Sequence, residues 1–208
     1  MYRPAEAEPA PARKPRSRSR RRDEITRTAC AVFARKGFQN STMRDVADAT
    51  GILAGSLYHH YASKDDLLVE VLKRFYADSI DDIGRVIEET PDPADAVVRL
   101  IELAVRYTVE RRDEAMIIEN DAPYLAQLPA FDFVFESASE AERRWIAVLE
   151  RARDSGQIRA DIDLPTLYRT IMGSMFASLR WYQPSGRMKP EQLAEHQVRL
   201  FFDGVRPR

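Results

Sequence analysis

The sequence predicts an all-α protein of about nine helices, and three observations support this fold class. Glycine is scarce, with 8 copies in 208 residues, so the sequence lacks the many tight turns of a β-rich fold. From Asp23 onward, apolar residues recur every three or four positions, as they do on one face of a helix. Helix start and stop signals punctuate this pattern, and no segment reads convincingly as a strand.

The first four helices are marked by the residues at their ends. Gly37 is placed to close the first helix as a left-handed cap, and Thr42 with Asp45 is a capping box that opens the second. Gly51 ends the second helix, and Ser63 begins the fourth. The four predicted helices cover residues 23–36, 42–50, 52–61 and 63–90.

The second half of the chain is also predicted to be helical. Aspartate and proline mark the starts of its helices, and proline or glycine marks their ends. Asp92 and Asp163 each stand just before a helix with proline in its first turn. Pro123 is expected to stop the short sixth helix, and Gly156 the seventh. The five predicted helices of this half cover residues 92–105, 115–121, 134–154, 163–182 and 190–202.

The net charge of −1 hides an uneven distribution along the chain. Residues 1–64 hold 13 Lys/Arg against 6 Asp/Glu, whereas residues 65–208 hold 19 against 27. A basic front joined to an acidic body indicates that only the front meets a polyanion. Residues 1–22 contain four prolines and a run of arginines, and we expect a disordered basic arm there, because such a segment cannot bury apolar surface.

The segment from Ser41 to Lys64 carries the functional chemistry. Two short helices separated by a glycine-containing turn are the ingredients of a helix-turn-helix, whose second helix enters the DNA major groove. Small residues at the start of that helix let its backbone approach base edges, and hydroxyl and imidazole groups can bind bases or phosphates. A threonine at a helix N-terminus and basic residues on either side add phosphate contacts. The predicted DNA-binding residues are Thr42, Arg44, Ala54, Gly55, Ser56, Tyr58, His59 and Lys64.

The tract GSLYHHYASK, residues 55–64, closely resembles the DNA-binding domain of the tetracycline-repressor (TetR) family of bacterial regulators. The likeness covers residues 42–68 and the end of the first helix, Phe33-Ala34-x-x-Gly37-Phe38. It implies that three N-terminal helices bind double-stranded DNA and that the remaining helices bind a ligand and dimerise. The expected organisation is therefore a basic arm over 1–22, a helix-turn-helix domain over 23–66, and an effector-binding and dimerisation domain over 67–208.

Two finer features qualify this resemblance. Ile52-Leu53-Ala54 stands where many members have a capping Ser or Thr before the recognition helix, so the start of that helix is open. The tracts over residues 156–163 and 178–182 are similar to those members that repress lipid or sterol breakdown genes and release DNA on binding an acyl-CoA. This second likeness implies an acyl-CoA as the candidate effector.

The helix over residues 164–182 has a bulky face and a small-residue face. Bulky methionine and aromatic side chains suit an irregular apolar ligand, although such stripes also form plain core. The predicted effector-binding residues are Tyr107, Met116, Asn120, Tyr124, Phe135, Trp145, Met172, Met175 and Phe176. Small residues let another helix approach closely, which predicts a four-helix dimer interface, with packing inside one protomer as the alternative. The predicted interface residues are Gly173, Ser174, Ala177, Ser178, Trp181, Leu193, Gln197, Leu200 and Phe201.

The resulting hypothesis is a dimeric repressor whose recognition helices lie ~34 Å, about one DNA turn, apart on a palindromic operator. A small apolar effector would tilt the helix over 67–89 and release the DNA. An activator, a repressor that answers to an unrelated hydrophobic compound, and a protein-binding adaptor remain open.

Enzymatic and membrane functions have no support in the sequence. His59 and His60 project ~100° apart on a helix and cannot share a metal ion, and no catalytic motif is present. We expect no cofactor and no metal. The single cysteine, Cys30, excludes an internal disulfide, and no apolar run approaches the ~20 residues of a membrane helix, so a cytoplasmic location is expected.

Overall fold

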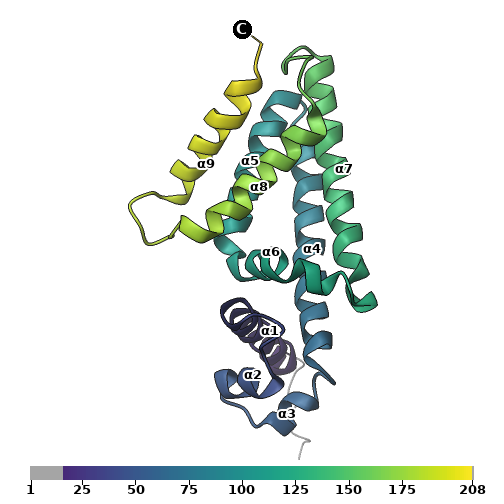
Figure 1. Ribbon diagram of the computed structural model, residues 1–208, viewed down its shortest axis with the longest axis vertical. Coiled ribbons are helices and arrows are strands. Elements are labelled where there is room, and N and C mark those ends of the chain that lie inside the picture. The colour runs from purple at the N-terminus through teal and green to yellow at the C-terminus, as the bar shows by residue number, and fades with distance from the viewer. Residues whose placement is uncertain (1–15, 208) are drawn as a thin grey trace, which may run out of the picture.

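A computed structural model describes residues 16–207, and this range folds into nine α-helices with one 3₁₀ turn and one π-helical turn (Figure 1). The all-α prediction is confirmed. The helices are α1 (Arg16–Lys36), α2 (Met43–Thr50), α3 (Ala54–Tyr58), α4 (Lys64–Glu89), α5 (Pro93–Glu110), α6 (Arg112–Leu125), α7 (Asp132–Asp154), α8 (Leu164–Trp181) and α9 (Pro190–Val198). The 3₁₀ turn η1 (Pro129–Phe131) precedes α7, and the π-helical turn η2 (Arg199–Asp203) follows α9.

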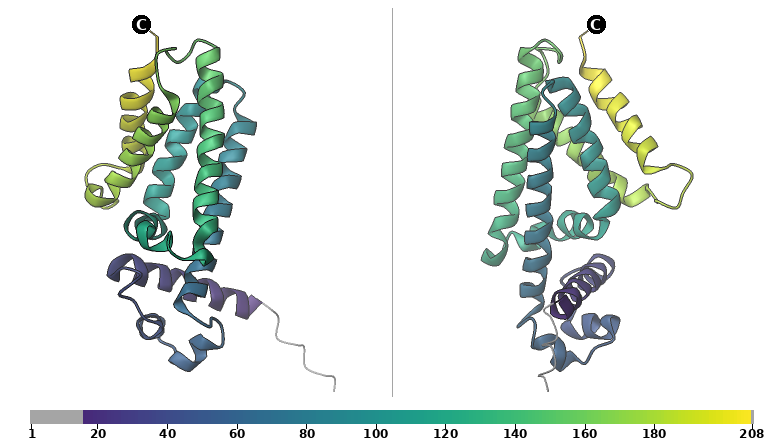
Figure 2. Two further views of the ribbon diagram at one scale, coloured as in Figure 1. Left: turned by 45° about the vertical axis from the view of Figure 1, so that its right-hand side comes forward. Right: turned by 180° about the vertical axis from the view of Figure 1, so that it is seen from behind.

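The molecule is divided into a small head and a larger helical body. Helices α1, α2 and α3 form the head at one end, and α4 runs from the head through the length of the body (Figure 1). In the body, α5 packs against α7, α8 and α9. Helix α6 lies across the base of the body and packs on α1 (Figure 2). Head and body are therefore joined covalently through α4 and by packing through α6.

The predicted start and stop signals of the head helices are confirmed. Thr42 Oγ1 accepts the N–H of Asp45 at 3.2 Å, and the Thr42 N–H donates to Asp45 Oδ2 at 2.8 Å, which is the reciprocal capping box. Ser63 Oγ accepts the N–H three residues later at 3.0 Å and caps α4. Gly37 and Gly51 have φ of 82° and 65°, a left-handed conformation that residues with a Cβ rarely adopt.

The expected disordered arm over residues 1–22 is wrong for its last seven residues, because α1 begins at Arg16. Residues 1–15 lie outside the described range. At the seventh residue of α1, the Arg22 guanidinium forms an ion pair with Glu70 on α4 and lies 5.4 Å from the centroid of the Tyr61 ring. These contacts supply the stabilisation that composition alone could not reveal.

Other helix boundaries also differ from the prediction, and those of α3 and α6 bear on the candidate sites. Helix α3 covers Ala54–Tyr58 rather than 52–61, and its N-cap residue, Leu53, makes no side-chain cap hydrogen bond. Helix α6 continues through Pro123 to Leu125 instead of ending before the proline. Pro123 removes one N–H donor from the hydrogen-bond ladder of α6, and the helix ends two residues after it.

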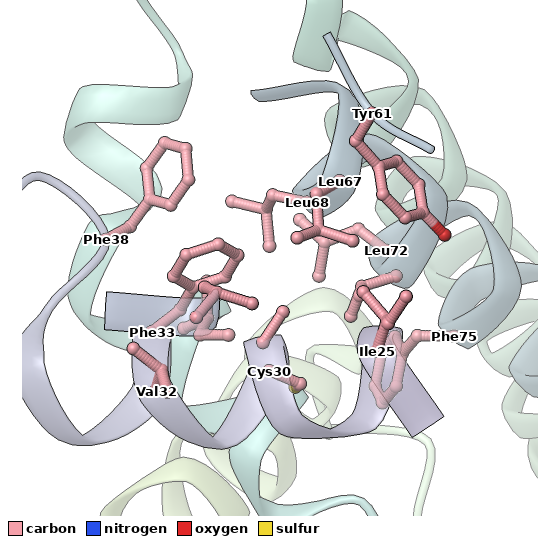
Figure 3. Packing of buried hydrophobic residues seen from close by; sticks show 14 of the residues in the cluster. Ile25, Cys30, Val32, Phe33, Phe38, Tyr61, Leu67, Leu68, Leu72 and Phe75 are labelled. Carbon is pink, nitrogen blue, oxygen red and sulfur yellow. The ribbon is translucent and has the colours of Figure 1, made fainter. Parts of the chain in front are cut away.

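Two clusters of buried side chains hold the head and the body. In the head, side chains from α1 and α4 point toward one another, with Phe33 and Leu68 fully buried at the centre (Figure 3). Leu57 fixes α3 to this cluster, and burying a leucine side chain is worth ~1.5–3 kcal/mol. Ile117 and Phe131 join the same cluster from the body. The head core is therefore continuous with α6 and η1, while a second cluster fills the body between α5, α7, α8 and α9.

Candidate DNA-binding surface and ligand cavity

Helix α3 presents most of its residues to solvent at the end of the head. Its one fully buried side chain, Leu57, anchors the helix, and Ala54 is half-buried. Gly55, Ser56 and His59 are exposed, and Tyr58 is 55% exposed. The predicted base-contacting residues thus lie together on one accessible surface. Leu53, 83% exposed, extends this surface and is not among the predicted DNA-binding residues.

The N-terminus of α2 lies next to this surface. Thr42 is exposed, but its N–H and its hydroxyl both donate to Asp45 Oδ2, at 2.8 and 2.7 Å. Asp45 also pairs with Lys36 at 2.6 Å, and the Lys36 and Thr42 hydrogen bonds lower the pKa of Asp45 to about 2. The neighbouring Arg44 is exposed. The first turn of α2 is therefore rigidly capped, with a guanidinium at its outer edge.

Lys64 has a role that differs from the phosphate contact expected from the sequence. Its Nζ donates to the carbonyl oxygens of Phe38, Gln39 and Ser41 at 2.9, 3.1 and 3.1 Å. The ammonium also lies 4.6 Å from the centroid of the Phe38 ring. An ammonium group has three N–H donors, so all of them are used inside the head. In this structure Lys64 therefore clamps the turn between α1 and α2, and its expected phosphate contact stays a prediction.

An apolar cavity of about 220 Å³ lies in the body between α4, α5, α6, α7 and α8. Aromatic rings, methionines and alanines make up most of its wall. Five of the nine predicted effector residues line it: Tyr107, Trp145, Met172, Met175 and Phe176. Lining residues that were not predicted include Phe75, Tyr76, Ser79 and Ile83 on α4, which carry the cavity wall onto the helix that enters the head.

The other four predicted effector residues do not line the cavity. On α6 the cavity is lined by Ala115 and Ile118, so Met116 and Asn120, each ~200° away from Ile118 around the helix, point elsewhere. Tyr124 packs with the head cluster, its ring 6.2 Å from that of Phe38. Phe135 on α7 is an exposed side chain. The periodicity identified apolar faces correctly but could not fix the rotation of α6.

Tyr107 separates the apolar cavity from a polar pocket of about 360 Å³. Its hydroxyl donates to Asp82 Oδ2 at 3.1 Å, and burial, together with the charge of Asp82, raises the pKa of Tyr107 above the usual range. Burial also raises the pKa of Tyr168, on the cavity wall, to about 12. These phenols stay protonated at neutral pH. Three arginines line the polar pocket, Arg85, Arg106 and Arg111, and carboxylates of Asp82 and Asp78 pair with them.

The predicted dimer residues divide into an exposed group and a buried group. Gly173 and Ala177 are exposed on α8, Trp181 is 57% exposed and Leu200 71% exposed, and Ser174 and Phe201 are half-buried. Ser178, Leu193 and Gln197 are buried inside the protomer, where Gln197 Oε1 accepts the Ser174 hydroxyl at 3.1 Å. These three are therefore covered within the protomer, where α9 packs mainly on α5 and is joined to α8 by the Ser174–Gln197 hydrogen bond.

Residues 16–207 contain no helix with the length and apolarity that crossing a bilayer requires. In the same range, no cluster of three or more His, Cys, Asp or Glu side chains is arranged to hold a metal ion.

Comparison with known proteins gives the same picture of a head and a body. Residues 25–71 match the family of bacterial regulatory proteins named tetR, and residues 90–205 match the tetracyclin repressor-like C-terminal domain. The transcriptional repressor KstR2 of Mycolicibacterium smegmatis is 32% identical over 89% of this chain and 90% of its own length. KstR2 of Mycobacterium tuberculosis is 30% identical over 89% of this chain and 92% of its own length.

Solved structures share the fold over most of their length. The structure of the ketosteroid transcriptional regulator KstR2 of Mycobacterium tuberculosis superposes with a TM-score of 0.86 at 29% identity, over 90% of this chain and 96% of that one. AibR in complex with isovaleryl coenzyme A and operator DNA has a TM-score of 0.76 at 21% identity, over 88% of this chain and 98% of that one. The C-terminal family match alone spans more than half of the sequence. The chain therefore belongs to the tetR family of helix-turn-helix transcriptional regulators, which are not enzymes, and is related to the KstR2 repressors.

Proposed function

We propose that this chain is a dimeric repressor that binds a palindromic operator and releases it when a small apolar effector fills the cavity in the body. One observation carries the proposal. Helix α4 lines the cavity through Phe75, Tyr76 and Ser79, and the same helix begins at Lys64, five residues beyond the exposed surface of α3. A ligand that displaces α4 acts directly on the element that positions the DNA-binding surface.

On DNA, the exposed surface of α3 supplies the base contacts. The Ser56 hydroxyl can donate to or accept from a base edge, and the exposed Leu53 offers an apolar contact for a thymine methyl group. Tyr58 and His59 are placed to reach phosphate oxygens. Arg44 adds a charge-assisted phosphate contact at the N-terminus of α2, where the helix dipole already favours an anion.

The chemistry of the cavity favours an amphipathic effector. Its wall of aromatic, methionine and alanine side chains accepts an apolar group, and the protonated tyrosine hydroxyls can orient it. Beyond Tyr107, the guanidinium groups of Arg85, Arg106 and Arg111 can exchange carboxylate partners for phosphate oxygens. An acyl-CoA from lipid or sterol catabolism combines these properties. The ketosteroid regulator KstR2 of Mycobacterium tuberculosis and AibR, which was solved with isovaleryl coenzyme A, support this class.

The exposed part of α8 and the segment after α9 form the proposed dimer interface. Trp181 and Leu200 are large apolar side chains left open to solvent, and Gly173 and Ala177 lie on the same exposed face of α8. A Cβ atom added at Gly173 would meet no atom within 4 Å apart from its chain neighbours and the backbone of its own helix. Nothing within the protomer therefore requires glycine there, whereas a partner helix that approaches closely does.

Operator selection and ligand screening test the two halves of the proposal. The purified protein selects its operator from a random duplex library. Fluorescence anisotropy then measures how much of the labelled operator stays bound while acyl-CoAs, steroids and fatty acids are added. A ligand at 100 times its dissociation constant stabilises the fold by ~2.7 kcal/mol, visible as a thermal shift. The same ligand is expected to weaken operator binding about 5–150-fold.

A matched pair of α7 variants shows whether the cavity is the ligand site. Ala141 lines the cavity, whereas Ala147, on the same helix, is exposed. Ala141→Phe is expected to abolish the thermal shift and the release of DNA, while Ala147→Phe preserves both. If no sequence is enriched by selection, the repressor proposal is wrong. If ligands stabilise the protein but leave operator affinity unchanged, the effector-controlled release is wrong.

A further inference from the structure

Phe38, in the turn between α1 and α2, is held at both of its backbone polar groups by side chains of opposite charge. Lys64 Nζ, at the start of α4, donates to the Phe38 carbonyl oxygen at 2.9 Å. The Asp121 carboxylate, on α6, accepts the Phe38 N–H at 3.3 Å. The Phe38 ring is fully buried among aromatic neighbours. Those neighbours are Phe33, Tyr124 and Phe131, with ring centroids 5.2, 6.2 and 6.1 Å away.

The position of Phe38 sets the position of the N-terminus of α2. The residue follows the left-handed Gly37, and only three residues separate it from Thr42, the N-cap of α2. The Ser41 hydroxyl donates to the Gly37 carbonyl oxygen at 2.7 Å and closes this short turn on itself. A turn so short and so fully hydrogen-bonded moves as one unit. A shift of Phe38 therefore shifts Thr42 and Arg44 with it.

Asp121 places a buried carboxylate at the contact between α6 and the α1–α2 turn, where apolar side chains could also pack. It is 6% exposed, and burial raises the pKa of its carboxyl, while the Phe38 N–H and the charge of Lys64 act in the opposite direction. Burying a carboxylate costs free energy unless hydrogen bonds offset it. Apolar packing between α1 and α6 already exists through Ile117 and Leu125. The directional hydrogen bond therefore adds what apolar packing lacks, a fixed orientation of the turn.

The helix that carries Asp121 also forms part of the cavity wall. Ala115 and Ile118 line the cavity, and Asp121 follows Ile118 by three residues, which places the two side chains as neighbours on the helix surface. One helix thus touches the proposed effector at one end and the α1–α2 turn at the other. A ligand that displaces Ile118 would therefore act on the same helix that carries Asp121.

We propose that Asp121 is a positioning residue for operator binding: together with Lys64 it orients the α1–α2 turn so that the N-terminus of α2 meets the phosphate backbone. It also ties that orientation to the position of α6. This inference rests on the proposed function, because it concerns the same operator complex. It assigns no DNA contact to either charged side chain.

Variants at Asp121 separate positioning from packing without any knowledge of the effector. Asp121→Leu removes the acceptor for the Phe38 N–H, whereas Asp121→Asn keeps an acceptor oxygen in a side chain of the same size. Asn120→Leu, at the neighbouring exposed position, is the matched control. Three quantities are measured on the full chain: operator affinity per folded molecule, the dependence of that affinity on salt, and the hydrogen-exchange rate of the Phe38 amide.

The loss of one charge-assisted hydrogen bond corresponds to about a 10-fold loss of operator affinity in Asp121→Leu, with faster exchange at Phe38. The salt dependence stays that of the wild type, because no phosphate contact is lost. Asp121→Asn restores most of the affinity, and Asn120→Leu changes neither quantity. Lys64→Met acts on the same turn, so Asp121→Leu combined with Lys64→Met loses less than the product of the two single losses.

Three results would overturn this role for Asp121. The first is wild-type operator affinity in folded Asp121→Leu. The second is a loss of operator binding that is fully explained by the fraction of unfolded Asp121→Leu molecules, because the folded molecules bind normally. The third is a Phe38 amide whose exchange rate is unchanged. If the wild type selects no operator, the proposed function fails, whereas the exchange rate of Phe38 still reports whether Asp121 holds the turn.

Discussion

Replacement of Arg44 by alanine should weaken operator binding in a way that depends strongly on salt. Arg44 is exposed in the first turn of α2, and the proposed two-fold dimer would bring two copies of it to the DNA. Each phosphate neutralised by a protein cation contributes ~0.9 to the slope of log affinity against log salt. Arg44→Ala should therefore lower this slope by ~1.8. Between ~50 and ~200 mM salt, the ratio of wild-type affinity to variant affinity should then fall about 12-fold.

Fluorescence anisotropy of a labelled operator at four or more salt concentrations measures this slope. Arg143→Ala serves as the control, because Arg143 is an exposed arginine on α7 in the body, and its loss should leave the slope unchanged. Lys64→Met should lower the affinity with little change in slope, because its ammonium is bound to three carbonyl groups of the head. An unchanged slope in Arg44→Ala would refute the placement of α2 against the backbone.

Three further expectations concern stability and assembly. Leu57→Ala should cost ~2–5 kcal/mol in chemical unfolding, because the buried side chain anchors α3, and a loss below ~1 kcal/mol would show that α3 is held by other contacts. Trp181→Glu should convert dimers to monomers in light scattering; a dimer that persists unchanged would place the interface elsewhere. The pKa of Asp45 is lower in the folded protein than its unfolded value of ~3.9, so the ionised carboxylate stabilises the fold at pH values above ~3.9. This contribution is lost as the pH falls toward 2. Asp45→Asn should therefore destabilise the protein more at pH 7 than at pH 2, and equal losses in urea unfolding at both would contradict the linkage.

The local signals in the sequence predicted the helices well because caps act over three or four residues. The Thr42–Asp45 box, the Ser63 cap and the left-handed Gly37 each involve only their own neighbours, so tertiary contacts do not have to be known. The prediction of where α1 starts was wrong for the opposite reason. Its stabilising partner, Glu70 on α4, lies 48 residues from Arg22 in the sequence.

The exposure of α3 and the apolar lining of the cavity agree with the sequence pattern, whereas other side chains lie differently from what the pattern suggested because their direction depends on packing. A long side chain can turn toward solvent or toward the protein, and Lys64 turns inward onto three carbonyl groups that no sequence pattern reveals. The period of α6 gave an apolar face, but which side faces the cavity depends on packing against α1 and α8. Ser178 and Gln197 fit a small or polar stripe, yet both are buried within the protomer, Gln197 on the helix that packs against α5.

Mapping of the bound operator by methylation interference tests the central claim most directly, because it reports where the exposed surface of α3 meets the bases. A dimer with one α3 in each of two successive major grooves should be sensitive to guanine N7 methylation at two patches on one face of the duplex, ~34 Å apart. Insensitivity to major-groove methylation, or a single patch without a symmetric partner, would contradict a paired helix-turn-helix.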